Sequence, residues 1–205
     1  MKELEKVLYL KRIKNKRCIL LFSGGIDSTT LLYLLKNFNF EIYTISINYK
    51  GRNKKEIEAS KKIAKKSLNN DHYLSKTFDH YIPARNGIFI FIGAYYAELL
   101  GIKYIFTGHT KEDLKRVPDI NENFIKSINK AIFYGTYVGK HIKTRVYLPF
   151  INLTNHDIVK LIIKYNIPIE ITWSCFREFD YLCGDCEGCK KRSEIISLVK
   201  SLKEG

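Results

Sequence analysis

Glycines, hydroxyl side chains and one carboxylate are concentrated between residues 23 and 29 of this chain. The stretch lies between the apolar runs 19–22 and 31–35, an order that predicts a buried strand, a tight turn and the beginning of a helix. Glycines let the backbone approach a ligand closely, and the free N–H groups of a helix N-terminus bind phosphate. We therefore predict a phosphate-binding turn, whose candidate ligands are Ser23, Gly24, Gly25, Asp27, Ser28 and Thr29.

This turn contains no lysine, which distinguishes it from the G-x-x-x-x-G-K-[ST] loop of ordinary nucleotidases. A plain strand-to-helix turn capped by serine and aspartate is the alternative interpretation. The glycine, serine and aspartate residues follow a buried strand directly, and ligands bind at that end of the strands in open α/β sheets. This position favours the ligand-binding interpretation.

The second group of chemically active residues is a set of four cysteines within fifteen residues of one another. Their two overlapping C-x-x-C steps let thiolates converge on one ion, and four sulfur ligands with no open position are typical of structural zinc. An iron–sulfur cluster is the alternative. The predicted ligands are Cys175, Cys183, Cys186 and Cys189, whereas Cys18 stands apart and is expected to be an inert core residue.

Strand and helix patterns alternate around the turn through the first 110 residues, which is typical of an α/β fold. We expect a doubly wound, mainly parallel sheet with helices on both faces. The predicted strands are 18–22, 41–49, 103–107 and 144–148, with a short strand also expected at 72–74. The predicted helices are 27–37, 54–68, 88–100, 121–133, 154–165 and 190–203.

The composition fits one domain over residues 1–205, with 172–192 as its zinc-binding segment. No apolar run approaches the roughly 20 residues that span a bilayer, so we expect a cytoplasmic protein without membrane contact. The formal net charge is +14. Lysines on solvent-facing helix positions account for much of it and an anionic ligand benefits from it, so direct nucleic-acid binding is not favoured, although it stays open.

The turn is similar to the S-G-G-x-D-S loop of the PP-loop ATP pyrophosphatases. Further motifs in family-like order make the chain resemble the 7-cyano-7-deazaguanine synthases within that group, over nearly its whole length after residue 18. Besides the turn and the cysteines, these motifs are Asn48-Tyr49-Lys50-Gly51-Arg52, Pro83-Ala84-Arg85-Asn86, Thr107-Gly108, Val117-Pro118-Asp119, Leu148-Pro149-Phe150 and Thr172-Trp173-Ser174-Cys175.

The resemblance implies an ATP-dependent ligase of the queuosine and archaeosine pathways. Such an enzyme adenylates 7-carboxy-7-deazaguanine, forms an amide with ammonia and activates the amide again to give the nitrile, 7-cyano-7-deazaguanine. It also implies that the turn holds the pyrophosphate end of ATP with Mg²⁺, because a bare Asp27 would repel phosphates. A homodimer and an external source of ammonia are further expectations.

Given the reaction that the resemblance implies, each group has an expected role. Asp27, Ser28 and Arg52 are the predicted catalytic residues. Arg85 is expected to bind phosphate or carboxylate, because a guanidinium forks onto such oxygens. The predicted substrate contacts are Asp113, Asp119 and Asn86, since a carboxylate can accept both N–H groups of a guanine-like edge. Loop capping is the alternative role for both aspartates.

The sequence departs from the family pattern near the expected substrate position. Ile120-Asn121 replaces a common Cys-Arg, Ala84 replaces a glycine, and the segment between 68 and 83 is short. A ligase for another carboxylate, or a reaction that ends at the amide, therefore stays open.

A PP-loop enzyme that thiolates tRNA or forms lysidine is a further alternative, because Thr107-Gly108-His109 is similar to a G-H motif of those families. Against thiolation, no cysteine lies between the turn and the cysteine-rich tail to carry sulfur. A nonenzymatic zinc-stabilised binder is disfavoured by Asp27, which adds nothing to pyrophosphate binding without a metal.

Overall fold

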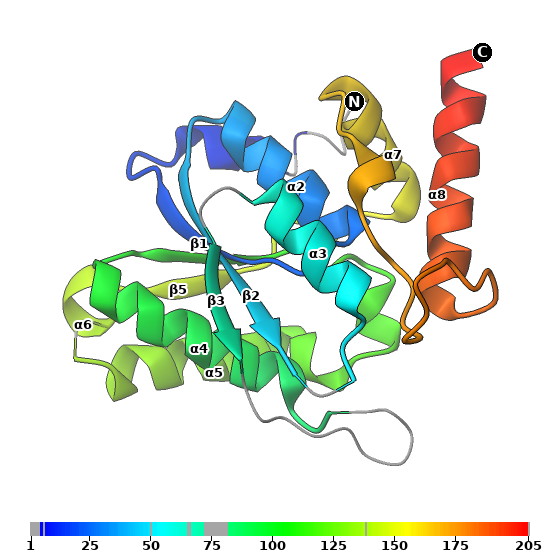
Figure 1. Cartoon of the computed structure of the whole chain (residues 1–205). Helices are drawn as coiled ribbons and strands as arrows, with labels where there is room; N and C mark the ends of the chain where they lie inside the picture. The colour runs from blue at the N-terminus through cyan, green and yellow to red at the C-terminus, as the bar shows by residue number, and fades with distance from the viewer. Residues whose placement is uncertain are drawn as a thin grey trace.

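The computed structural model describes residues 5, 7–49, 51–64, 67–71, 82–137 and 139–204. Its strands form a five-stranded sheet in the order β3-β2-β1-β4-β5, with every neighbouring pair parallel (Figure 1). The strands are β1 (Arg17–Leu21), β2 (Glu41–Asn48), β3 (Ser67–Asp71), β4 (Tyr104–Thr107) and β5 (Arg145–Tyr147). All five therefore end at the same edge, which in such sheets is the ligand-binding edge.

Helices cover both faces of this sheet, as the sequence predicts (Figure 1). On one face lie α2 (Ile26–Asn37), α3 (Lys54–Ile63) and α7 (Asn155–Lys164), and α8 (Glu187–Glu204) packs beside α7. On the other lie α4 (Arg85–Leu100) and α5 (Glu122–Gly135), followed by the short α6 (Gly139–Ile142). Short 3-10 turns complete the connections: η1 (Tyr9–Arg12), η2 (Asp113–Lys115), η3 (Pro118–Ile120) and η4 (Ile169–Ile171).

The alternation of side chains along β1 divides the core into two layers. Cys18 and Leu20 belong to the cluster that contains the apolar side chains of α2 and α7. Ile19, between them, belongs to the cluster formed with α4 and α5. Cys18 is fully buried, which confirms its predicted place in the core, and burial raises the pKa of its thiol.

The predicted helix over 54–68 is wrong at its C-terminal end. α3 stops at Ile63, and residues 67–71 form β3, which pairs with residues 44–48 of β2. Cross-strand hydrogen bonds available only in the folded sheet override the local helical pattern here. The strand expected at 72–74 lies outside the described residues.

A capping box begins α7. The Thr154 side chain accepts a hydrogen bond from the Asp157 N–H, and the Asp157 carboxylate accepts one from the Thr154 N–H. Among the described residues, no helix is both long and apolar enough to cross a membrane.

Candidate active site

The turn between β1 and α2 depends on glycine because other elements pack directly against it. Gly24 has φ +88, and a Cβ there would lie 2.8 Å from the backbone nitrogen of Ser60 in α3. Gly108, just after β4, touches the turn from the other side, where a Cβ would lie 3.0 Å from the Ser28 nitrogen. The helix α3 and the residue after β4 thus pack so closely against the turn that a side chain at either glycine would disrupt it.

Beside this turn is a cavity of about 280 Å³, above the carboxyl ends of β1, β2 and β4. It brings together residues that lie far apart in the sequence. Of the predicted site residues, those that line it are Ser23, Gly25, Asp27, Ser28, Arg52, Arg85, Asn86 and Asp113. The Thr29 side chain is instead fully buried and is not part of the described lining.

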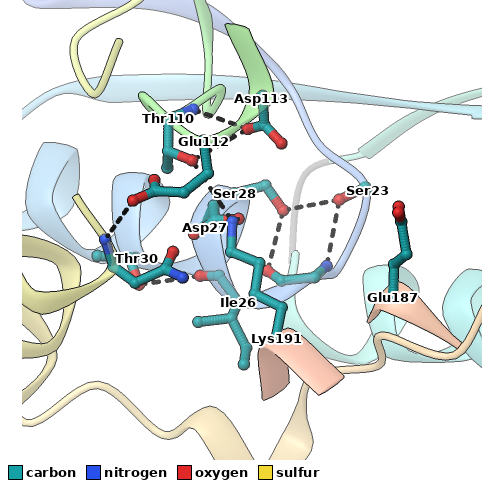
Figure 2. Close-up of polar contacts among 12 residues, drawn as sticks. Ser23, Ile26, Asp27, Ser28, Thr30, Thr110, Glu112, Asp113, Glu187 and Lys191 are labelled. Atoms are coloured by element: carbon teal, nitrogen blue, oxygen red, sulfur yellow. Dashed lines mark hydrogen bonds and ion pairs between the residues drawn. The ribbon is translucent and has the colours of Figure 1, made fainter. Parts of the chain in front are cut away.

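The serine hydroxyls are arranged around the turn by hydrogen bonds. The Oγ atoms of Ser23 and Ser28 lie 3.0 Å apart, and the Gly25 N–H donates to Ser23 Oγ at 3.2 Å. Ser28 Oγ also donates to the Gly25 carbonyl at 3.1 Å (Figure 2). These contacts keep two neutral hydroxyls on the cavity side of the helix N-terminus.

Asp27 has a half-buried carboxylate with one occupied and one free oxygen. Oδ2 lies 2.7 Å from Lys191 Nζ, whereas Oδ1 is buried and has no hydrogen-bond partner among the described residues (Figure 2). Burial raises the pKa of Asp27, and the Lys191 ammonium opposes that rise. A buried carboxylate oxygen without a partner fits a site completed by a cation.

Lys191 is a site residue that sequence reasoning missed. It lies in the first turns of α8, 164 residues after Asp27, and also approaches Thr110 Oγ1 at 3.4 Å. Burial lowers the pKa of Lys191, but the carboxylates of Asp27 and Asp113 outweigh it, and the net shift is upward. Neither motif nor spacing signals this contact, because it depends on how α8 docks.

The Arg52 guanidinium is directed into the protein, where it braces the turn. It donates to the Ile47 carbonyl at 2.6 Å and the Ser23 carbonyl at 2.8 Å, and it lies 3.3 Å from the Glu56 carboxylate. Its side chain is 3% exposed. Arg52 thereby ties the end of β2 to the first residue of the turn.

Arg85 and His109 form other parts of the cavity wall. Arg85 begins α4 and is close enough to Tyr49 to oppose the rise in the pKa of that phenol, which burial causes. His109 Nδ1 lies 2.9 Å from Thr107 Oγ1, and burial lowers the pKa of the ring. A largely neutral imidazole thus faces the cavity, at a position that the sequence suggested only through a weak G-H motif.

Asp119 is satisfied by Asn86 and lies behind it, outside the described cavity lining. The Asn86 N–H donates to Asp119 Oδ2 at 2.7 Å, and Asn86 Nδ2 donates to Oδ1 at 2.8 Å. This clamp caps the beginning of α4. Of the predicted substrate residues, Asn86 and Asp113 therefore reach the cavity directly, and Asp119 acts on it through Asn86.

Asp113, the first residue of η2, is held in the cavity wall by hydrogen bonds from Thr110 and Arg116. Its Oδ2 accepts from the Thr110 N–H at 2.8 Å, and its Oδ1 accepts from Arg116 at 3.0 Å. Burial raises the pKa of Asp113, but Lys191 and the Thr110 hydrogen bond outweigh this and lower it. Asp113 is thus held as a carboxylate.

All four predicted thiol ligands converge at the start of α8, with their sulfur atoms within 4.8 Å of one another. Cys175 and Cys189 are buried, and Cys183 and Cys186 are half-buried. Four soft donors in this arrangement fit one tetrahedral metal ion. The segment also contacts the turn, because the Trp173 N–H donates to the Gly24 carbonyl at 3.1 Å.

A family model described as queuosine biosynthesis protein QueC matches residues 17–78 and 67–199. The chain belongs to the QueC family. The 7-cyano-7-deazaguanine synthase of Thermoplasma volcanium is 34% identical over 204 residues, which cover 86% of this chain and 85% of that protein. The synthase of Nautilia profundicola is 33% identical and covers 86% of this chain and 91% of its own length.

Solved structures with low sequence identity share the fold of this QueC family member. The NH3-dependent NAD synthetase of Campylobacter jejuni has a TM-score of 0.55 and 16% identity, over 98% of this chain and 90% of that chain. The U34-tRNA thiolase NcsA of Methanococcus maripaludis, solved with its [4Fe-4S] cluster, has a TM-score of 0.54 and 16% identity, over 99% and 73%. The PP-loop type of α/β fold is therefore confirmed.

The departures from the QueC family pattern have structural roles here. Ile120 is 1% exposed in the core, and the Asn121 side chain caps α5 by accepting from the Phe124 N–H. Neither belongs to the described cavity lining. Ala84, at the expected glycine, has φ +51 and precedes α4, a conformation that normally favours glycine.

Proposed function

We propose that this protein is an ATP-dependent ligase that converts 7-carboxy-7-deazaguanine and ammonia to 7-cyano-7-deazaguanine. The observation that carries this proposal is the buried, unpartnered Oδ1 of Asp27, on a glycine turn beside the cavity of a QueC family member. The names of the curated relatives support the substrate class.

In the proposed reaction, the substrate carboxylate attacks the α-phosphorus of ATP and pyrophosphate leaves. Ammonia then displaces AMP to give the amide, and a second adenylation of the amide oxygen permits elimination to the nitrile. Each adenylation develops negative charge on the pyrophosphate. We assign its stabilisation to the backbone N–H groups at the start of α2 and to the hydroxyls of Ser23 and Ser28.

The metal requirements follow from the donors that the chain supplies. Asp27 offers a hard oxygen ligand, its unpartnered Oδ1, which fits Mg²⁺, and Mg²⁺ would supply charge neutralisation for the phosphates. The four cysteines fit a closed structural Zn²⁺ site that anchors the beginning of α8. We place no chemical step at that site because all four tetrahedral positions have a sulfur donor.

At the other end of the cavity, we propose that Asn86 and Asp113 orient the deazapurine and that Asp119 positions Asn86. Arg85 is our candidate for the anionic carboxylate or a phosphate. Arg52 acts through the turn, because its guanidinium holds the Ser23 carbonyl. The single domain and the homodimer stay predictions.

Incubation with Mg²⁺, ATP, ammonium and 7-carboxy-7-deazaguanine tests the proposal. AMP formation that requires the deazapurine acid, with the nitrile mass as product, is the expected result. Accumulation of the amide alone would show a shortened reaction. AMP formation that requires tRNA would replace this proposal with the tRNA-modifying alternative, and no AMP despite ATP binding would point to a binding protein.

A further inference from the structure

Lys191 brings a positive charge to a phosphate-binding turn that has no lysine of its own. Its Nζ lies 2.7 Å from Asp27 Oδ2, and its side chain is 17% exposed. Figure 2 shows this side chain reaching from α8 toward the turn that carries Ser23 and Ser28. A cavity of about 160 Å³ is lined by Lys191 together with Ser23, Gly25 and Asp27. Phosphate oxygens entering it would meet the ammonium directly.

The position of Lys191 is fixed by its neighbours on both sides. Arg192 donates to Thr172 Oγ1 at 2.6 Å and to the Ile169 carbonyl at 3.0 Å, which holds α8 against η4. Trp173, the residue after Thr172, donates its backbone N–H to the Gly24 carbonyl of the turn. Cys189 lies only two residues before Lys191. The cysteine-rich segment therefore delivers the ammonium to a defined place beside the turn.

The charges around Lys191 indicate that its ion pair with Asp27 would change when a cation and phosphates bind. The carboxylates of Asp113 and Glu112 both act on Asp27, and Asp27 Oδ1 still has no partner among the described residues. A cation bound at Asp27 would repel the ammonium beside it. Phosphates that arrive with that cation would offer the ammonium new oxygen partners at short range.

We propose that Lys191 is a pyrophosphate-binding residue that pairs with Asp27 in the free protein and with phosphate oxygens in the nucleotide complex. This inference rests on the proposed function, because it requires a magnesium nucleotide at the turn. It gives the cysteine-rich segment a second task besides stability, which is to position the cation that the turn itself lacks. The Lys191 ammonium also balances the negative charge of Asp27 until the nucleotide binds.

The test compares Lys191→Met with the control Lys190→Met. Lys190 is the neighbouring residue in the sequence, and it is exposed. Calorimetry measures the binding of pyrophosphate and of α,β-methylene-ATP, each with Mg²⁺. We expect Lys191→Met to weaken both by about ten- to a hundredfold, the effect of losing a charge-assisted hydrogen bond. Lys190→Met is expected to match the wild type, and Lys191→Arg to retain most of the affinity.

A second titration distinguishes phosphate binding from a merely structural ion pair. Mn²⁺ alone is expected to bind Lys191→Met more tightly than the wild type, because no ammonium competes for Asp27. The same substitution thus moves metal affinity and pyrophosphate affinity in opposite directions. Content of cysteine-bound metal and the melting temperature are measured in parallel, and Lys191→Gln replaces the methionine variant if the latter is unstable.

The possible failures are separable. Unchanged pyrophosphate affinity in a folded Lys191→Met protein would overturn the role of Lys191 and leave the ligase proposal standing. A wild-type protein that binds neither pyrophosphate nor the ATP analogue would overturn both. Parallel losses of Mn²⁺ and pyrophosphate affinity would show that Lys191 only supports the shape of the turn.

Discussion

Asp27 and Asp119 are both carboxylates near the carboxyl edge of the sheet, the first half-buried and the second buried, and their hydrogen-bond partners differ. Asp119 accepts one hydrogen bond on each oxygen from Asn86, so both of its oxygens have a partner within the fold. Asp27 has one oxygen against a distant lysine and one without a partner among the described residues. From this difference we expect the carboxylate with an unpartnered oxygen to bind ligand, and the one that is hydrogen-bonded on both oxygens to support the fold.

The largest expected effect is the loss of turnover caused by Asp27→Asn. The amide cannot hold a magnesium nucleotide as a carboxylate does, so we expect turnover to fall by about a thousandfold or more. The fold should persist, because the substitution is nearly isosteric. Measurement of AMP formation and thermal unfolding checks both parts, and retained turnover would contradict the distinction between the two carboxylates.

The second-largest effect is expected at the cysteine cluster, which holds the beginning of α8 and thereby Lys191, the partner of Asp27. Cys186→Ser removes one of four thiol ligands, so we expect loss of bound zinc and a fall in melting temperature of roughly 10 °C or more, because metal binding is coupled to folding. Elemental analysis and calorimetry measure these. Pyrophosphate affinity should also fall as α8 loosens, whereas a full zinc content would show that the four sulfurs do not form one site.

A smaller and different effect is expected for Asp119→Ala. It removes two hydrogen bonds to a buried carboxylate, so the free energy of unfolding should fall by about 2 to 4 kcal/mol. Turnover at saturating substrate should change little, while the KM for the deazapurine rises because Asn86 loses its clamp. A thousandfold loss of turnover with normal stability would reverse the comparison and make Asp119 the catalytic carboxylate.

The smallest effect is expected for Thr154→Ala, which removes a purely structural contact away from the cavity. Thr154→Ala breaks the capping box that joins Thr154 and Asp157 on α7. We expect a loss of about 1 kcal/mol in the free energy of unfolding by urea titration, with no change in either kinetic constant. Altered kinetics would mean that α7 is coupled to the site.

Much of the architecture was predictable because it depends on near neighbours in the chain. The strand–turn–helix at 17–37, the capping box at Thr154 and the cysteine cluster follow from glycine conformations, local hydrogen bonds and short ligand spacing. The alternation of strands and helices likewise follows from local apolar patterns. The end of α3 did not, since residues 67–71 become a strand only when β2 is beside them.

By itself, the sequence determined the parallel α/β fold, the cysteine set, the phosphate-binding turn as a candidate and the family. Tertiary structure decided which carboxylate is free, that Arg52 faces inward, and that Lys191 meets Asp27 across 164 residues. The physical reason is range. Backbone conformations and ligand spacings are set within a few residues, but the partners of a buried charge are set by the docking of whole helices.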